Sequence, residues 1–340
     1  MKTMKTIKNQ FIPKFMKTLS LCFVFGWLIG TPNLFAQKSS IPGAFVDVGL
    51  GARPVAMGSA YSGLADDINA LFWNPAGLTN LKEKQASFTT AKIFGLITYN
   101  MVSVGMPIPS DGPKQGAGLA LIYSGDEMLR EMTITAGFGR EVGPVTLGAN
   151  LKYRYASFGN NGFNEADYNF IFSQEEIDLG KSNQVRGSAN GFGIDLGLLY
   201  QFDSTLRFGL MLRDLVAPVM WNSQSDSKLA KGKYTESVPF ESVIGTSYKI
   251  SNEFTMTADL KPAFTKDVST TIRGGAELRL FKFLFVRAGL QNSVNSENDE
   301  KYVFGFGFNY GIKKSTLKFD YTYLSEQLAS SNRLTLSFTF

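Results

Sequence analysis

Long stretches of the chain alternate between apolar and polar residues, position by position. From 145 to 155 every odd position is apolar, while the even positions carry Thr, Gly, Asn, Lys and Arg. From 302 to 310 the even positions are Phe or Tyr, and the odd positions are Val, Gly, Gly and Asn. A period of two indicates β-strands whose faces meet different surroundings. Beyond residue 36 no apolar run approaches 18 residues, so a helical membrane protein is excluded.

Alternation alone fits two architectures. In a water-soluble sandwich the apolar face forms the core, whereas in a transmembrane barrel it faces lipid and the polar face lines the lumen. We read about fourteen strands, an even number with lengths that suit a tilted bilayer crossing, which favours the barrel. They are predicted at 83–93, 97–108, 115–124, 131–139, 145–158, 190–202, 205–214, 240–249, 254–263, 270–280, 283–291, 301–310, 315–324 and 332–340.

The connections and the C-terminus favour a barrel as well. If the N-terminus is periplasmic, that side has short turns such as 143–144 and 203–204, and the other side has long links at 159–189, 215–239 and 292–300. The links at 94–96 and 109–114 depart from this rule. The chain ends in RLTLSFTF, which resembles the terminal strand of outer-membrane barrels. We therefore predict an all-β transmembrane barrel of about 14 antiparallel strands over 83–340.

The first 36 residues are predicted to be a secretory signal peptide. Five lysines and no acidic residue precede the apolar run 19–30, and LFAQ offers a cleavage site near Ala36 or Gln37. The single cysteine, Cys22, lies in that run. Without the five lysines, 29 basic residues face 29 acidic ones, so the basic pI gives no reason to expect a nucleic-acid partner. The expected location is the outer membrane of a Gram-negative cell.

The absence of histidine limits the chemistry. It excludes a Ser-His-Asp or Cys-His triad and any histidine metal site. We find no motif for carboxylate-based hydrolysis or for a Ser-Lys pair. We therefore expect a non-enzymatic protein without cofactor or metal.

Residues 37–82 do not alternate, and we expect them to form a short helical hatch in the lumen. Small residues dominate up to Gly63, with a short helix expected near 54–60. Around Asp66 the sequence ADDINALFW can form one or two helical turns, capped by Asp66 or Asp67. Asn74-Pro75 should end this helix, because the residue before proline disfavours helical geometry.

GARPVAMGSAYSGLADDINALFWNPAGL, residues 51–78, resembles the N-terminal motif of the PorV/PorQ family of outer-membrane proteins. It is also similar to the hatch of FadL-type transporters of hydrophobic compounds. The resemblance implies a 14-stranded barrel with this segment in its lumen. It also implies one of two functions: a partner of type IX secretion-system components and exported proteins, or a passive route for hydrophobic small molecules.

The polar residues of the hatch allow a gating role or a purely structural one. The hatch positions concerned are Arg53, Gly58, Asp66, Asp67, Trp73, Asn74, Pro75 and Gly77. We expect Arg53 to pair with Asp66 or Asp67, or with a wall acid such as Asp195. Trp73 is expected to anchor the hatch against the wall. Possible lumen-lining residues are Lys152, Arg154, Asp195, Arg207 and Arg213.

Secretion partner is the leading hypothesis from the sequence, and passive uptake of hydrophobic compounds is the alternative. The second hypothesis requires an apolar cavity between hatch and wall that opens sideways.

Overall fold

The computed structural model describes residues 48–126, 128–159, 173–225, 231–264, 269–294, 300–327 and 329–340. The predicted signal peptide and residues 37–47 lie outside the described residues. The strands are β1 Gln85–Ile93, β2 Ile97–Ile108, β3 Gln115–Gly125, β4 Leu129–Val142, β5 Val145–Phe158, β6 Val185–Gln201, β7 Leu206–Val216, β8 Pro218–Ser225, β9 Lys231–Ser237, β10 Glu241–Lys249, β11 Phe254–Lys261, β12 Thr271–Arg279, β13 Leu284–Ser293, β14 Lys301–Ile312, β15 Ser315–Ser325 and β16 Ser331–Thr339. The helices are α2 Ala52–Ala56, α3 Ala70–Trp73, the 3₁₀ helix η1 Pro75–Asn80, and α5 Gln174–Asn183.

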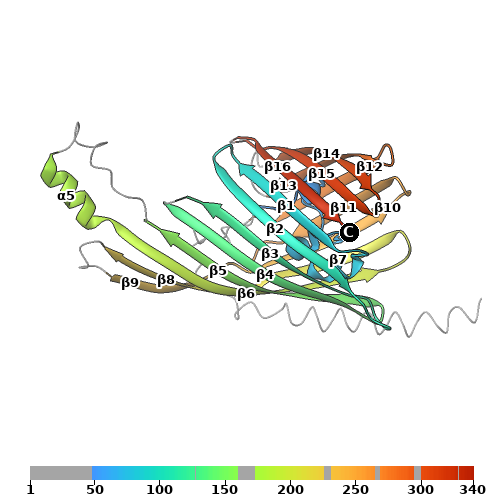
Figure 1. Ribbon diagram of the computed structural model, residues 1–340, viewed down its shortest axis with the longest axis horizontal. Coiled ribbons are helices and arrows are strands. Elements are labelled where there is room, and N and C mark those ends of the chain that lie inside the picture. Colours follow the sequence, from blue (N-terminus) through green and yellow to red (C-terminus); the bar gives the residue numbers. More distant parts are fainter. Residues whose placement is uncertain are drawn as a thin grey trace, which may run out of the picture. The chain divides into compact units, whose positions relative to one another are not determined.

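Fourteen of these strands close into an antiparallel barrel (Figure 1). Each of β1 to β7 and of β10 to β16 pairs with its neighbours, and the first strand pairs with the last from Gln85↔Thr339 to Lys92↔Asn332. Closure leaves the barrel ladder without a free edge, as hydrocarbon surroundings demand. The prediction of a fourteen-stranded barrel is confirmed.

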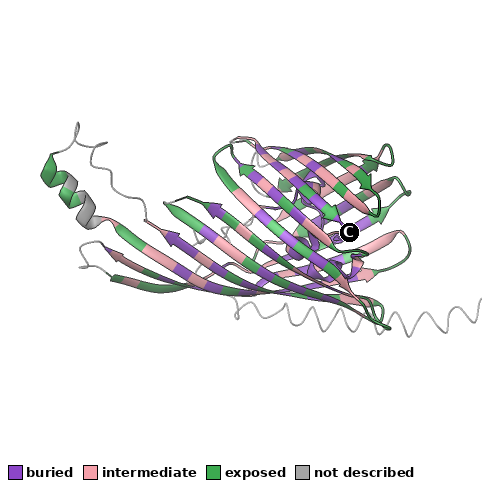
Figure 2. Ribbon diagram, viewed as in Figure 1, coloured by how far each residue is buried: buried purple, intermediate pink, exposed green. Residues whose placement is uncertain are grey.

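The orientation of the two faces decides between sandwich and barrel. On β5 the apolar Leu151 is 60% exposed, whereas its neighbours Asn150 and Lys152 are 2% and 9% exposed. Figure 2 shows the same alternation of buried and exposed positions along the other strands. The apolar residues therefore face outward and the polar ones inward, which is the transmembrane arrangement.

The two ends of the barrel have different connections. One end, the turn end, carries both chain termini of the barrel and the links 109–114, 143–144, 202–205, 250–253, 280–283 and 313–314. The opposite end, the loop end, carries the link 94–96, and β3, β5, β11, β13 and β15 end there. The links at 94–96 and 109–114 depart from the length rule as the sequence indicated, and β1, β2 and β3 lie close to their predicted ranges.

One predicted loop is wrong. The link 215–239 contains strands β8 and β9, which extend β7 and β10 beyond the loop end, and β8 pairs with the first half of β6 (Figure 1). Strand β6 correspondingly begins at Val185 rather than at 190. The pattern was missed because β8 and β9 are short and polar on the face that carries apolar residues elsewhere.

In the extension formed by β5, β6, β8 and β9, the outward residues are polar and the inward residues are apolar, which is the reverse of the barrel. Lower on β6 the outward residues are Phe192 and Leu196, but higher up they are Arg186, Ser188 and Asn190. The inward positions change from polar to apolar, where Ala156, Ala189, Ala217, Val219, Trp221 and Val238 form a buried cluster. A sheet that is polar outside and apolar inside is built for water, so the extension stands beyond the lipid-facing band.

The register shifts between β6 and β7. Leu196 pairs with Leu212 and Ile194 pairs with Val216, so β7 carries two extra residues across this step. Asp214 lies in the bulge with a φ of 55°. A bulge in a barrel strand locally interrupts the ladder and re-aims side chains.

Residues 48–82 lie inside the barrel and are almost entirely buried. Helix α2 contacts β13 to β16, and η1 contacts β2 to β6. Within the described ranges, no helix combines the length and the apolar character needed to cross a bilayer.

The hatch packs backbone to backbone against the wall at lumen-facing glycines. A Cβ built on any of these glycines would lie closer than 3.0 Å to hatch atoms; they are Gly116, Gly148, Gly197, Gly209, Gly275 and Gly289. Glycine is required at such positions because it lets another backbone approach closely. These contacts join the hatch to β3, β5, β6, β7, β12 and β13.

We expect Gly148→Ala to loosen the seating of the hatch. The new methyl group would meet the backbone of Pro75 and Ala76, and overpacking of this kind costs about 1–3 kcal/mol. The measurement is urea unfolding of the refolded barrel in detergent, combined with trypsin cleavage of the hatch. Gly311→Ala is the matched control, because nothing lies within 4 Å of a Cβ there. Equal stability of the two variants would contradict backbone-tight seating.

Candidate functional site

The first helix of the hatch is α2. It begins two residues before the helix expected near 54–60 and ends four residues before it. Pro54 lies in its first turn, where a missing N–H is tolerated. Gly58 ends it with a φ of 63°, and a Cβ there would strike the carbonyl oxygen of Gly274 on β12. Gly58 therefore serves both the helix end and the contact with the wall.

Asn74-Pro75 ends α3 as predicted. Asn74 is extended, with φ −166° and ψ 104°, and its Oδ1 accepts a hydrogen bond from the backbone N–H of Ala76 at 3.2 Å. Its Nδ2 donates to the carbonyls of Ser62 and Leu198 at 2.8 and 3.1 Å. Asn74 thus caps η1, with Pro75 as its first residue, and ties the hatch to β6. Gly77 lets η1 pass the backbone of Ala65.

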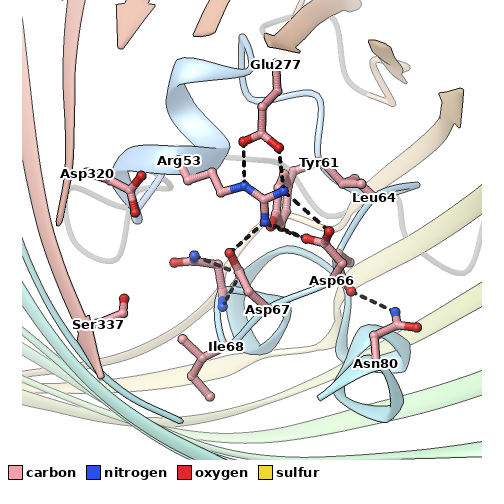
Figure 3. Close-up of polar contacts among 12 residues, drawn as sticks. Arg53, Tyr61, Leu64, Asp66, Asp67, Ile68, Asn80, Glu277, Asp320 and Ser337 are labelled. Carbon is pink, nitrogen blue, oxygen red and sulfur yellow. Dashed lines mark hydrogen bonds and ion pairs between the residues drawn. The ribbon is translucent and has the colours of Figure 1, made fainter. Parts of the chain in front are cut away.

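Arg53 is the centre of an ionic network (Figure 3). Its Nη1 lies 2.6 Å from Asp66 Oδ1 and 3.0 Å from Asp67 Oδ2. On its other side, Nε and Nη2 donate to the two carboxylate oxygens of Glu277 on β12 at 2.8 and 2.9 Å. Arg53 therefore joins both hatch acids to the wall through a two-point contact with Glu277, which is the geometry that guanidinium groups favour.

The network continues through the wall. Arg287 on β13 donates to Glu277 Oε2 and to Asp320 Oδ1 on β15, both at 2.6 Å. The sequence-based expectation of Asp195 as a wall partner of Arg53 is wrong, because Asp195 pairs with Lys152 on the other side of the lumen at 2.7 Å. Glu277, Arg287 and Asp320 were not singled out, although each occupies an inward position of an alternating strand.

Asp67 accepts a backbone N–H directly before α3, close to the expected cap, whereas Asp66 belongs to the ionic network. Asp67 Oδ1 accepts hydrogen bonds from the backbone and side-chain nitrogens of Asn69 at 2.9 and 2.8 Å. Burial opposes the charge on Asp66, but Arg53 and the Tyr61 hydroxyl outweigh it and hold the pKa of Asp66 below its ordinary value. Asp66 is therefore ionised at neutral pH, and the contact with Arg53 is an ion pair.

Trp73 stabilises the hatch internally. Its Nε1 donates to the Leu50 carbonyl at 2.8 Å, and its ring meets Tyr61 and Phe72 edge-on at 6.4 and 5.6 Å between centroids. These partners all belong to the hatch, and Trp73 also belongs to a buried apolar cluster that includes Ala120, Val303 and Leu324 of the wall.

The predicted lumen residues form a second ionic cluster around the β7 bulge. Asp214 Oδ1 lies 3.2 Å from Lys152 Nζ and 2.7 Å from Arg154 Nη2. Asp195 accepts the backbone N–H of Asp214 at 2.9 Å. The alternating pattern found Lys152, Arg154 and Asp195, but Asp214 was missed because the bulge turns it out of register.

The two remaining predicted lumen residues contact the hatch. Arg207 donates from Nη1 to the Leu64 carbonyl at 2.9 Å. Arg213 donates from Nη2 to the Phe72 carbonyl at 3.0 Å, and its guanidinium lies 5.0 Å from the centroid of the Phe72 ring. Arg213 also pairs with Glu241 at 3.4 Å.

Two cavities lie on the loop-end side of the hatch. The first, which we call the inner cleft, has a volume of about 80 Å³. It is lined by hatch residues Val48, Leu50, Leu71 and Phe72, by Tyr99, Ile122 and Met132 of the wall, and by the bulge residues Arg213 and Asp214 together with Lys152 and Arg154. The second, the vestibule, measures about 460 Å³ and lies against the other side of Val48, with Trp73 in its lining.

No protein-family model and no curated protein matches the chain. Solved structures do match it. The CymD monoaromatic hydrocarbon channel is 16% identical with a TM-score of 0.58, over 87% of this chain and 99% of that one. The toluene transporter TodX of Pseudomonas putida is 15% identical with a TM-score of 0.55, over 86% and 99%. A FadL homologue of Pseudomonas aeruginosa is 11% identical with a TM-score of 0.56, over 86% and 98%.

The chain has the fold of the FadL-type outer-membrane barrels. At these identities the likeness extends to the fold alone. The FadL-type fold that the resemblance at residues 51–78 implied is therefore present, whereas the neighbours add nothing for PorV/PorQ membership or for type IX secretion. The CymD and TodX neighbours are described as a channel and a transporter.

Replacing Arg53 tests the ionic network. We expect Arg53→Ala to destabilise the folded barrel by about 3–5 kcal/mol, because it leaves buried carboxylates without their partner. Arg53→Lys should recover only part of the loss, since an ammonium cannot make the two-point contact with Glu277. The measurement is again the free energy of unfolding in urea.

Lys114→Ala is the control for this experiment. It removes the Lys114–Glu141 pair at the turn end, where the lysine side chain is 73% exposed. Exposed pairs of this kind contribute up to about 1 kcal/mol. A loss at Arg53 no larger than the loss at Lys114 would mean that the network does not hold the hatch.

Proposed function

We propose that this protein is a passive channel for hydrophobic small molecules in the outer membrane. The observation that carries the proposal is the position of the inner cleft. One side of the cleft is the apolar surface of the hatch. Its wall side runs from β2 to β5 and includes Arg213 and Asp214 at the β7 bulge, where the ladder of the wall is interrupted. A molecule that enters from the loop end and settles on the hatch would thus stand beside the irregular part of the wall.

The tight contact between hatch and wall supports a sideways route. The glycine contacts around η1 and α2 leave the hatch backbone against the wall backbone. The Arg53 network further fixes the hatch to β12. A hydrophobic solute gains nothing from the aqueous periplasm, and it is stabilised when it moves from the cleft into lipid. The route proposed is therefore from the loop end to the inner cleft and then through the wall beside Asp214.

A reversible cross-link tests the proposal. Ile194 and Val216 pair across the bulge, and the only native cysteine, Cys22, lies in the predicted signal peptide. We expect the Ile194→Cys/Val216→Cys disulfide to lower toluene uptake by whole cells about tenfold, a barrier increase of ~1.4 kcal/mol. Reduction should restore the uptake.

The matched control is Val102→Cys/Leu121→Cys, a pair on the regular β2–β3 ladder. Its oxidation should leave uptake unchanged. Two results contradict the proposal: uptake by cells with the wild-type barrel that equals uptake by cells without it, or unchanged uptake with the bulge cross-link fully oxidised.

The secretion-partner hypothesis stays a prediction from the 51–78 motif. The feature that bears on it is the extension of β5, β6, β8 and β9, a surface above the lipid band on which a partner could dock. Mild-detergent co-purification from native membranes tests it. Recovery of the barrel alone, together with normal protein export in a deletion strain, would count against it.

A further inference from the structure

Four basic side chains lie on the outer face of the extension and of β4 beside it, and all four are exposed. We call this surface the basic face; its basic residues are Arg130 on β4, Arg186 on β6, and Lys231 and Lys233 on β9. The other outward residues beyond the apolar band are neutral: Tyr155, Ser157, Ser188, Asn190, Asn222 and Gln224. The charge on the outer side of these described strands therefore has a single sign.

The carboxylates of these upper strands face the other way. Glu131 on β4 is buried, and Glu236 on β9 accepts a hydrogen bond from the indole Nε1 of Trp221 at 2.5 Å. The exposed Tyr234 also stacks on Trp221, with 6.0 Å between the ring centroids. Tyr234 and Glu236 therefore occupy the inner side of β9, and the lysines at the alternate positions occupy its outer side.

Three of the four basic residues form no ion pair within the described part of the chain; they are Arg130, Lys231 and Lys233. Asp126, in the turn before β4, accepts two backbone N–H groups of that turn at 2.8 and 3.3 Å. The acidic residues of α5 belong to a helix that Figure 1 shows beyond the start of β6. The basic face therefore presents positive charge to whatever lies beside it.

The basic face begins where the lipid-facing surface ends. On β4, Arg130 follows Met132 at the next outward position. On β8, Asn222 follows the exposed Met220 at the next outward position, and Asn222 pairs with Lys233 of β9. Arg130 and Lys233 thus occupy the first polar positions beyond the apolar band, on opposite sides of the face.

This position corresponds to the headgroup layer of a bilayer. Two residues of a strand tilted by about 45° rise roughly 5 Å, and the headgroup layer of one leaflet is about 5–7 Å thick. Tyr153 on β5 marks the same boundary, because its exposed ring faces lipid and its hydroxyl donates to Asn190 Oδ1 at 2.8 Å. Tyrosine is typical of the interface between membrane and water.

We propose that the basic face binds the phosphate-bearing headgroups of lipids in the leaflet at the loop end. The phosphate oxygens accept hydrogen bonds from the guanidinium of Arg130 and from the ammonium of Lys233, and the acyl chains of these lipids lie along the apolar band next to them. Arginine binds phosphate through two parallel donors, and lysine binds it as a point charge. The inference goes beyond the channel proposal, because it concerns the outer surface of the protein and not its lumen.

Continuity with the lipid-facing surface favours a lipid over a protein partner. The same strands carry both surfaces without a break, whereas the core of a protein interface is depleted of charge and enriched in aromatic residues. Lysine on an exposed edge strand also discourages pairing with another chain, which accounts for the lysines of β9. It does not account for Arg130 and Arg186, which lie on strands inside the sheet.

Two short-chain lipids test the proposal. Dioctanoyl phosphatidic acid and dioctanoyl phosphatidylcholine have the same acyl chains, but choline balances the phosphate charge of the second. Dissociation constants are measured by native mass spectrometry of the full barrel released from detergent micelles. We expect the wild type to bind phosphatidic acid more tightly than phosphatidylcholine. Arg130→Gln/Lys233→Gln should weaken phosphatidic acid binding about thirtyfold, since each basic side chain at an anionic surface contributes roughly fivefold, and should leave phosphatidylcholine binding unchanged.

Two further variants serve as controls. Lys313→Gln/Lys314→Gln removes the same charge from the exposed turn between β14 and β15, at the turn end, and should leave both affinities unchanged. Arg130→Lys/Lys233→Arg keeps the charge and should keep the preference for phosphatidic acid. A salt titration of the wild type needs no variant: the affinity for phosphatidic acid should fall as sodium chloride is raised, because salt screens the attraction between charges.

Three results overturn the proposal: equal affinity of the wild type for the two lipids, unchanged phosphatidic acid binding in the folded Arg130→Gln/Lys233→Gln barrel, or an equal loss in the turn-end control. Glycerol 3-phosphate carries the phosphate without acyl chains. If it displaces phosphatidic acid as well as phosphatidic acid itself does, the face binds soluble phosphates and not lipid.

A protein partner is the remaining competitor for this face. A protein that co-purifies in mild detergent with the wild type but not with Arg130→Gln/Lys233→Gln, together with unchanged phosphatidic acid binding, would replace the lipid by that protein. The channel proposal is judged separately, by toluene uptake with the bulge cross-link, so either proposal can fail without the other.

Discussion

Hydrogen bonding of the backbone in a medium that offers no partners is the constraint on which this structure depends. Strand β1 meets it by pairing with β16, so the barrel ladder closes on itself. A barrel in lipid needs apolar residues on its outer face, and the polar residues at the intervening positions then face the lumen. The lumen is consequently rich in polar and charged groups, which need partners of their own. Much of the interior organisation, including the Arg53 network and the cluster around Asp214, answers that second requirement.

The hatch meets the requirement in two different ways. Toward the turn end it presents its backbone to the glycines of the wall, a contact that excludes both solute and side chains. Toward β12 it presents Arg53, whose partners come from the hatch and from Glu277. The hatch makes tight contacts on its turn-end side and borders cavities on its loop-end side, so the two ends of the lumen differ. This asymmetry, more than the barrel itself, is what favours a route from the loop end to the wall over a route straight through.

The sequence predicted those parts of the fold that depend on local periodicity. The fourteen barrel strands lie close to their expected ranges because each must alternate over the whole thickness of the membrane. Strands β8 and β9 were missed, since they leave the lipid and lose the apolar outer face that marked the others. The Asn74-Pro75 stop was readable because it depends on adjacent residues. Glu277 as partner of Arg53 was not, because the two residues are 224 positions apart and no local pattern joins them.

The reversal of polarity along β6 marks where the barrel crosses the membrane surface. Below Asn190 the outer face of the sheet carries Phe192 and Leu196, and above it the outer face carries Ser188 and Arg186. Sinking the barrel deeper would place an arginine in hydrocarbon, and raising it would expose a phenylalanine and a leucine to water. The outer face of β6 therefore sets the depth at which the protein lies in its membrane. The same few residues set the depth of both cavities in the membrane.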